Sequence, residues 1–328
     1  MRRGRNRCIL VALLGGILTL LPAAQAGAQE TGDVAADECC LALLLPVGAR
    51  ALALGGTLTA RRAPDGIFVN PASVANLPSA EVRLHSAKTE IERSTGITAL
   101  FGISDAGTLA FSYRLVDYGD IDATDEVGNA TGRIRIADQA LNATFATEAM
   151  PGVRAGVTYT LFQFSSDCTG MCGDPGFQAT SHALNLGVQV QPSWIPWLDL
   201  GASLNNLGQS LQVRNAVQAA EMPTRIRVGA AYELLHLMRP DSTVRLWGSV
   251  DGSTSWHEGV EPQVSAALEL DMDGTIFVRS SWASGEGRGT GAAVGIGLVY
   301  DRFEISVGKA FVGIEDSAPI QISLAVRF

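Results

Sequence analysis

Alternation of apolar and polar side chains dominates the chain from residue 81 to its end. In the last nine residues, apolar side chains occupy every second position from Ile320 to Phe328, and Gln321, Ser323 and Arg327 are among those between them. A period of two places successive side chains on opposite faces of a β-strand, so this stretch predicts a strand with one apolar and one polar face. The same pattern predicts fourteen strands, at 82–91, 97–103, 108–118, 135–147, 153–165, 179–190, 198–206, 223–234, 242–251, 261–271, 274–283, 290–300, 302–312 and 318–328.

The lengths of these strands and of their connections indicate a barrel. Most of the strands have about 10 to 12 residues, which suits a tilted strand that crosses a bilayer. The longest connections, 119–134, 166–178 and 207–222, all fall on the same side of an up-and-down sheet. We therefore predict an all-β fold, a transmembrane antiparallel up-and-down β-barrel of about 14 strands, with long loops outside and short turns in the periplasm.

A soluble β-sandwich is the alternative, since it also has alternating strands with frequent turns. Two features count against it. The polar faces carry little lysine, with only Lys88 and Lys309 in the whole chain. Fourteen uniform strands also exceed what one sandwich normally uses.

The N-terminus has the features of an export signal. Four arginines lie between residues 2 and 7, an apolar stretch covers 8–21, and small residues precede a cleavage point after Ala28. An uncleaved anchor is the alternative, but the stretch is shorter than the roughly 20 residues of a spanning helix. We expect a signal peptide at 1–28, an N-terminal periplasmic or hatch segment at 29–80, and an outer-membrane β-barrel at 81–328.

The charge of the exported chain excludes one class of partner. Residues 1–28 contain four arginines and no acid, so their removal leaves 20 basic and 33 acidic side chains, a net charge of about −13. Nucleic-acid binding depends on basic patches that neutralise phosphates. A nucleic-acid partner is therefore not expected.

Four cysteines remain in the exported chain, where conditions favour disulfides. Cys168 and Cys172 lie in a loop rich in Gly, Asp and Pro, and we expect a small disulfide ring there. A metal site made by all four cysteines is the alternative, but the pairs lie far apart and neither has C-x-x-C spacing. The role of the adjacent Cys39 and Cys40 is left open.

The segment 46–77 differs from the rest, because its small residues and glycines do not alternate. A short helix is expected at 49–54, ended by two glycines, and Asn70 before Pro71 opens a turn. The run G-A-R-A-L-A-L-G-G followed by D-G-I-F-V-N-P-A resembles the start of the mature chain in the FadL and PorV/PorQ group of outer-membrane β-barrels. Ser73-Val74 departs from the Gly-Leu that this group more often has. The resemblance implies a plug, or hatch, inside the barrel, with the motif residues Gly48, Arg50, Gly55, Gly56, Asp65, Asn70, Pro71 and Ala72.

Charges of both signs fall on the polar phase of the strands. An open anion pore would show one sign in rings, whereas this mixture indicates ion pairs that fill the lumen. Charges away from water are costly unless paired, so we expect them to interlock with the charged side chains of segment 46–77. The candidate lumen charges are Arg154, Arg227, Arg245, Glu269, Arg279 and Glu304.

No catalytic chemistry is apparent. The four histidines are isolated, and no nucleophile elbow, zinc-protease motif or phosphate-binding glycine loop accompanies them. A barrel phospholipase would need a serine, a histidine and an orienting group together. The acidic loop 120–125 lacks EF-hand ligand spacing. We expect no enzyme, no catalytic residue, no cofactor and no metal.

Two functions follow from the resemblance. The PorV/PorQ side implies a plugged barrel that acts with secretion-system proteins in secretion or surface attachment of cargo, and the length of the chain favours this reading. The alternative is FadL-like transport of a hydrophobic small molecule. Both place the protein in outer-membrane lipid of the Gram-negative type. The terminal Phe328 is similar to the signal that such proteins present to the barrel-assembly machinery.

Overall fold

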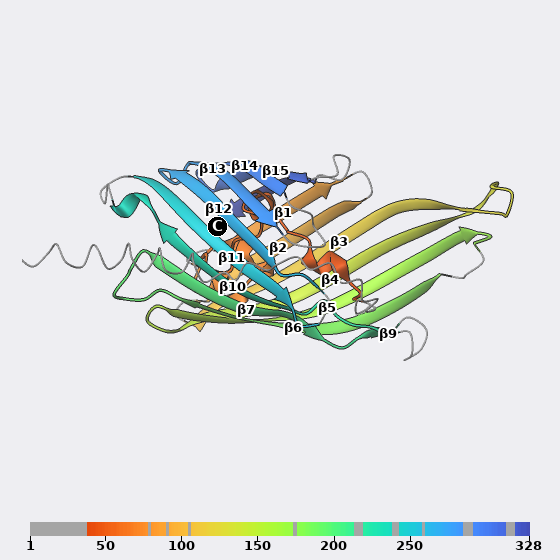
Figure 1. Cartoon of the computed structure of the whole chain (residues 1–328), viewed down its shortest axis with the longest axis horizontal. Coiled ribbons are helices and arrows are strands. Elements are labelled where there is room, and N and C mark those ends of the chain that lie inside the picture. The colour runs from red at the N-terminus through yellow and green to blue at the C-terminus, as the bar shows by residue number, and fades with distance from the viewer. Residues whose placement is uncertain are drawn as a thin grey trace, which may run out of the picture. The chain divides into compact units, whose positions relative to one another are not determined.

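The computed structural model contains a closed antiparallel barrel, which confirms the predicted fold class (Figure 1). The structure describes residues 38–77, 80–89, 92–103, 106–172, 176–212, 219–237, 243–257, 260–284, 291–312 and 319–328. The signal peptide expected at 1–28 lies outside these ranges. Among the described residues, no helix is long and apolar enough to span a membrane.

Fourteen strands form the wall, each hydrogen-bonded to its neighbours in the order β1-β16-β15-β14-β13-β12-β11-β10-β7-β6-β5-β4-β3-β2, and β2 closes on β1. A separate two-stranded ribbon, β8 with β9, occupies the connection 207–222. The wall strands are β1 (Glu81–Lys88), β2 (Arg93–Ile103), β3 (Gly107–Thr124), β4 (Ala130–Met150), β5 (Val153–Gly170), β6 (Phe177–Val190), β7 (Leu198–Gly208), β10 (Arg225–Glu233), β11 (Val244–Ser255), β12 (Gln263–Met272), β13 (Ile276–Ser284), β14 (Gly291–Tyr300), β15 (Phe303–Val312) and β16 (Ile320–Arg327), and the ribbon is β8 (Leu211–Gln212) with β9 (Ala219–Ala220).

The apolar phase of these strands faces outward and the polar phase inward. On β16, Ile322 and Leu324 are about half exposed, whereas Gln321 and Ser323 are buried. This order is the reverse of a water-soluble protein and matches a barrel with a lipid-facing exterior. Polar side chains in the lumen then need partners there.

Three neighbouring strands extend furthest beyond the ends that their alternation predicts. β3 continues to Thr124, β4 begins already at Ala130, and β5 continues to Gly170. These strands extend well beyond the other strands on the right of Figure 1. The segment 119–134, expected to be a loop, is therefore mostly a hairpin. Its residues are exposed on both faces, so alternation of burial could not mark it as a strand. We call this the hairpin end of the barrel and the opposite one the turn end.

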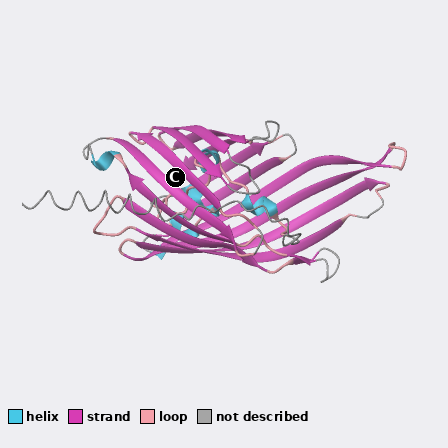
Figure 2. Cartoon of the chain, viewed as in Figure 1, coloured by secondary structure: helices cyan, strands magenta, loops and turns pink. Residues whose placement is uncertain are grey.

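The N-terminal residues lie inside the barrel as short helices and turns, drawn as coils within the strands in Figure 2. The elements are η1 (Leu41–Leu44), α2 (Ala49–Ala53), η2 (Pro64–Phe68) and η3 (Pro71–Val74), and one further short helix, η6 (Leu235–Leu237), lies at a turn. α2 contacts β13 to β16, and η3 contacts β4 to β6. We call residues 46–77 the plug.

The glycine pair ends α2 as its sequence predicts. Gly55 donates its backbone N–H to the carbonyl of Leu52, and Gly56 donates to that of Ala51. Both glycines have positive φ, 58° and 78°, which residues with a Cβ rarely adopt. These bonds form a Schellman motif, so the chain turns sharply away from the wall after one and a half turns of helix.

The described part of the N-terminal segment reaches both ends of the barrel. Glu38 pairs with Arg225 through two bonds of 2.7 Å each, at the hairpin end. At the other extreme of the segment, the backbone of Leu77 donates to Thr108 at the turn end, 3.0 Å away. The described part of the segment therefore runs the length of the lumen, because a buried ion pair holds its first residue at the hairpin end.

This pair supplies a pH-dependent contact. Burial alone would raise the pKa of Glu38, but hydrogen bonds from Arg225 and Ser255 outweigh it and hold that pKa below the usual glutamate value of 4.5. A carboxyl with a lowered pKa stabilises the folded form above its ordinary pKa, and the contribution disappears as pH falls through the lowered value. We expect limited proteolysis to cut near Glu38 faster at pH 3 than at pH 7, and Arg225→Gln to abolish the difference. Equal cleavage at both pH values in the original protein would contradict this.

Candidate functional site

The plug lies in the lumen, and two groups of buried ion pairs join it to the wall. In the first, Glu269 on β12 accepts from three guanidiniums. Arg50 binds it through two nitrogens, at 2.9 and 2.8 Å, a forked geometry that only arginine provides. Arg61 lies 3.1 Å and Arg279 2.8 Å from its oxygens. Because Arg50 and Arg61 belong to the plug, one wall carboxylate binds it at two points.

The second group centres on Arg83 of β1, a residue that is only 2% exposed. Its guanidinium binds both oxygens of Asp65 in the plug, at 3.1 and 3.0 Å. It also binds Glu304, at 2.7 Å, and Glu81. Arg327 joins the same two glutamates. The plug therefore contributes a carboxylate, Asp65, to the second group, whereas it contributes Arg50 and Arg61 to the first.

The expected lumen charges therefore separate into distinct surroundings. Glu269, Arg279 and Glu304 pair as described above. Arg154 is buried and donates to Gln189, 3.2 Å away. Arg227 is partly buried beside the plug, and its Nε has no hydrogen-bond partner among the described residues. Arg245 differs from expectation, because it lies near the start of β11 and is exposed.

Arg83, the central residue of the second group, is not among the lumen charges expected from the sequence. It lies on β1 between Glu81 and His85, in the polar phase of a strand that we expected to begin at Val82. Its position between the apolar Val82 and Leu84 in the alternating pattern is the signal that could have marked it as a lumen residue. Arg62, expected to pair with wall charges, instead donates to the backbone carbonyl of Asn76 within the plug.

The turn at Asn70 joins the plug to the wall through its amide. The Asn70 Nδ2 donates to the carbonyls of Thr59, Val188 and Ala202, at 2.7, 3.0 and 3.3 Å. Its Oδ1 accepts from the N–H of Ala72, at 3.0 Å, which caps η3. Pro71 follows as the first residue of η3, where a missing N–H costs nothing. Val188 and Ala202 face each other on β6 and β7, so this turn contacts both strands.

Wall glycines make room for the plug. A Cβ built on Gly201 would lie 2.1 Å from the carbonyl oxygen of Thr59, and one on Gly187 would lie 1.9 Å from Asn70 Oδ1. In the same way, a Cβ built on Gly308 would meet the carbonyl oxygen of Ala49, and one on Gly295 would meet the Cβ of Ala53. Gly48 of the motif has a φ of 98°, and a Cβ built on it would lie 3.1 Å from the side chains of Asp65 and His85. The glycines of the wall are thus part of the plug's seat.

Both cysteine pairs are joined. Cys168 and Cys172 form a disulfide at the end of β5, in the loop where the ring is expected. Cys39 and Cys40 form a second disulfide between adjacent residues. Cys39 and Cys40 pack against a cluster that includes Phe162. Within the described residues, no three His, Cys, Asp or Glu side chains gather as a metal site would need.

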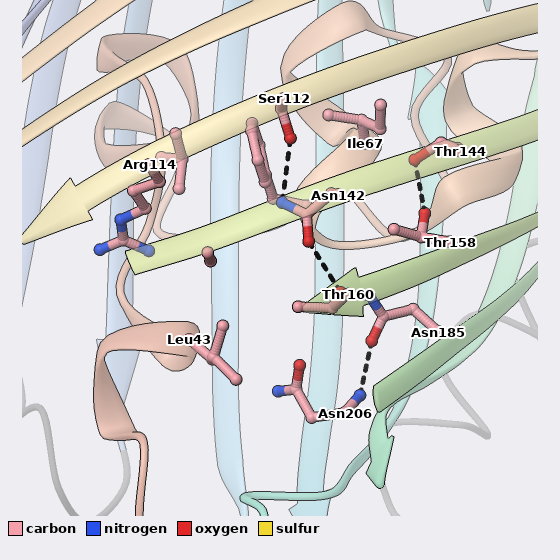
Figure 3. Close-up of a pocket in the computed structure, with 13 residues that line it drawn as sticks. Leu43, Ile67, Ser112, Arg114, Asn142, Thr144, Thr158, Thr160, Asn185 and Asn206 are labelled. Atoms are coloured by element: carbon pink, nitrogen blue, oxygen red, sulfur yellow. Dashed lines mark hydrogen bonds between the residues drawn. The ribbon is translucent and has the colours of Figure 1, made fainter. Parts of the chain in front are cut away.

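A recess lies between the plug and strands β3 to β7 (Figure 3). Its volume is about 460 Å³, open solvent included. On the wall, hydrogen bonds link Asn142 to Ser112, at 2.9 Å, and Thr160 to Asn142, at 2.7 Å. The plug and the residues before it contribute apolar side chains. The recess is lined by Leu43, Val47, Ile67, Phe68, Ser112, Arg114, Ala140, Asn142, Thr144, Thr158, Thr160, Asn185 and Asn206.

The wall beside the recess has an interrupted ladder. Leu184 pairs with Leu207 and Leu186 pairs with Leu204, so two residues of β7 stand opposite Asn185. One of them, Asn206, has a φ of 58°, and its N–H donates to Asn185 Oδ1, at 2.6 Å, instead of to a backbone carbonyl. Such a bulge bends a strand and disrupts the local ladder. This register shift of the described wall lies at the recess, because Asn185 and Asn206 are both among the lining residues.

The terminal Phe328 is 73% exposed, and its N–H donates to the carbonyl of Ala80. Its recognition by the assembly machinery stays a prediction.

Solved structures with this fold are known. The chain aligns with the Pseudomonas putida toluene transporter TodX at a TM-score of 0.59 and 13% identity, covering 85% of this chain and 96% of that one. The CymD monoaromatic hydrocarbon channel gives 0.60 and 11%, covering 87% and 98%. A Pseudomonas aeruginosa FadL homologue gives 0.56 and 10%, covering 87% and 98%. No family model and no curated protein matches the sequence. At these identities the likeness shows the fold alone.

Proposed function

We propose that the protein lies in the outer membrane and lets a small hydrophobic or amphipathic molecule cross, while its plug excludes ions. The observation that carries this proposal is the recess between plug and wall, placed beside the interrupted ladder of β6 and β7. A ligand pocket of this kind is concave and combines apolar surface with a few fixed polar groups. The outward apolar face of the strands supports the membrane location.

This reverses the order of the two functions expected from the sequence. The aligned structures are named as a toluene transporter, a hydrocarbon channel and a FadL homologue, and none of these names refers to secretion. They are also consistent with a role without catalysis. The ion pairs between plug and wall, within the part of the chain that the structure describes, favour a plugged lumen over a permissive pore.

The proposed route enters at the hairpin end, passes the recess and leaves sideways between β6 and β7. The bulge at Asn206 weakens the ladder at that point, and Asn70 of the plug contacts both strands just beyond it. Movement of the plug at Asn70 would therefore act directly on this seam. Sideways release delivers an apolar molecule into lipid without passage through the ion pairs.

An uptake assay tests the route. Purified protein in liposomes is offered toluene and phenylacetate, and the wild type is compared with the oxidised pair Leu184→Cys with Leu207→Cys. These positions are partners across the bulged seam, and partners in an antiparallel pair lie close enough for cross-linking. We expect uptake by the wild type of at least one probe, and loss of uptake to the protein-free level in the cross-linked variant.

The matched control is the pair Ala202→Cys with Val228→Cys, which are partners across the regular seam of β7 and β10. This cross-link should leave uptake unchanged. Absence of uptake of both probes by the wild type would overturn the proposed function. Equal uptake by both cross-linked variants would overturn the sideways route.

A second function, docking of a protein at the surface, is favoured by one observation. The tips of the hairpin end carry exposed apolar side chains, Val127 at 85% and Met171 at 75%. Exposed apolar residues at a rim are typical of interaction sites when they gather in a patch. We propose this role as the alternative, and a failed uptake assay together with partner capture that depends on Val127 and Met171 would favour it.

A further inference from the structure

Arg114 of β3 is a buried cation that forms no ion pair within the described part of the chain. Its residue is 6% exposed, and it lines the recess. Arg50 and Arg83 bind carboxylates directly, and Arg154, which donates to Gln189, does not line the recess. Burial of an unpaired charge is costly, so such a group points to a counter-charge that arrives from elsewhere.

The contacts of Arg114 leave most of its donors unused. Its Nε donates to Ser94 Oγ, at 3.2 Å, and its Nη1 to the carbonyl of Leu45, at a long 3.4 Å. Neither acceptor is charged. A guanidinium carries five N–H groups in a planar fork that matches a carboxylate. These two bonds leave the other N–H groups of Arg114, a residue that lines the recess, available to a ligand.

The acidic groups nearby do not neutralise it at contact distance. Asp138 of β4 accepts the hydroxyl of Tyr118, at 2.8 Å, and Glu92 lies near enough to act on the charge of Arg114. One further donor faces the same way. Ser112 lies two residues before Arg114, on the same face of β3, and accepts from Asn142, so its own hydrogen is free to donate.

The recess also has an apolar lining. Val47 and Phe68 of the plug belong to it, together with Leu43 and Ile67. A molecule that fits both kinds of lining has an apolar body and an anionic group at one end. The volume of about 460 Å³ includes open solvent and is therefore an upper limit on the space for the apolar body, which suits a compact body such as a single ring.

We propose that the recess selects compact amphipathic carboxylates, with the guanidinium of Arg114 as the anchor of the carboxylate and the plug as the apolar wall. This inference rests on the proposed transport function and names the substrate class of that same site. A neutral hydrocarbon would fill the apolar side but leave Arg114 without a counter-charge. The acid therefore binds more tightly than a neutral molecule of the same shape.

Calorimetric binding of phenylacetate and of phenylacetamide to the purified protein tests this. The two probes differ only in the anionic group. We expect the wild type to bind phenylacetate about tenfold or more tighter than the amide, because a hydrogen-bonded charge pair contributes that much. Arg114→Gln should weaken phenylacetate by about 10- to 100-fold and leave the amide unchanged.

Two further variants keep the result interpretable. Arg114→Lys retains the charge without the fork and should give an intermediate affinity. Arg133→Gln, at an exposed arginine of β4, should change neither affinity. The heat-dependent shift of the folded barrel on a gel reports whether each variant has folded.

The outcomes separate the two proposals. If the wild type binds acid and amide equally, or if folded Arg114→Gln keeps the affinity for the acid, the carboxylate inference is overturned while transport of hydrophobic molecules stands. If the wild type binds neither probe and takes up neither toluene nor phenylacetate, both are overturned.

Discussion

Glu269→Gln is expected to open the barrel to ions. The substitution removes the carboxylate that binds Arg50, Arg61 and Arg279, so three buried guanidiniums lose their counter-charge at once. Breaking a buried ion pair from one side costs about 3–5 kcal/mol, because the remaining charge is left unpaired. Movement of Arg50 and Arg61 toward water would relieve this cost and carry the plug away from β12. Single-channel recording in a planar bilayer should then show conductance that the wild type lacks.

The stability of this variant and two comparisons complete the test. Unfolding in urea should show a loss of about 3–5 kcal/mol relative to the wild type. Arg50→Gln should have a smaller effect, since Arg61 and Arg279 still satisfy Glu269. Glu126→Gln changes an exposed glutamate in the β3–β4 hairpin and should behave as the wild type. An electrically closed Glu269→Gln barrel of unchanged stability would mean that these ion pairs do not hold the plug.

Gly201→Ala is expected to displace the plug from the other side of the lumen. The added Cβ would meet the carbonyl oxygen of Thr59 at 2.1 Å, and this atom belongs to the backbone and cannot rotate away. Overpacking of this kind typically costs about 1–3 kcal/mol. Displacement of Thr59 also affects its bonds to Asn70 and to Asp251. We expect lower stability in urea and faster proteolysis of the plug.

Gly252→Ala is the matched control, because it makes the same change on a wall strand where the nearest atom to the new Cβ lies 3.9 Å away. It should leave stability and proteolysis unchanged. Equal behaviour of the two variants would show that the plug does not rest on Gly201.

The fold could be predicted because each wall strand has one face in lipid and one in the lumen. That arrangement writes a period of two into the sequence, as in Ile320 to Phe328, and counting the runs gives the number of strands. The end of α2 was equally local, since two adjacent glycines form the motif that stops it. The extension of β3 to Thr124 could not be predicted, because Asp120 and Asp122 are exposed and the alternating pattern stops there.

The partners within the site could not be predicted from the sequence. Polar phase alone marks Glu269 and Arg154 as equivalent, yet one binds three arginines and the other a glutamine. Which of them meets the plug depends on where α2 and η3 dock, and that is set by contacts between residues about 130 to 220 positions apart. The seat made by Gly187 and Gly201 depends on the same docking, because a glycine in a strand has several explanations.

The central claim is that a plug held by buried ion pairs closes the barrel to ions while the recess beside it admits a small apolar molecule. The most direct measurement records single-channel conductance and uptake of toluene and phenylacetate for the wild type and for a deletion of residues 46–77. We expect the wild type to be electrically closed and to take up at least one probe, and the deletion to conduct. A wild type that conducts as freely as the deletion, or that takes up neither probe, would contradict it.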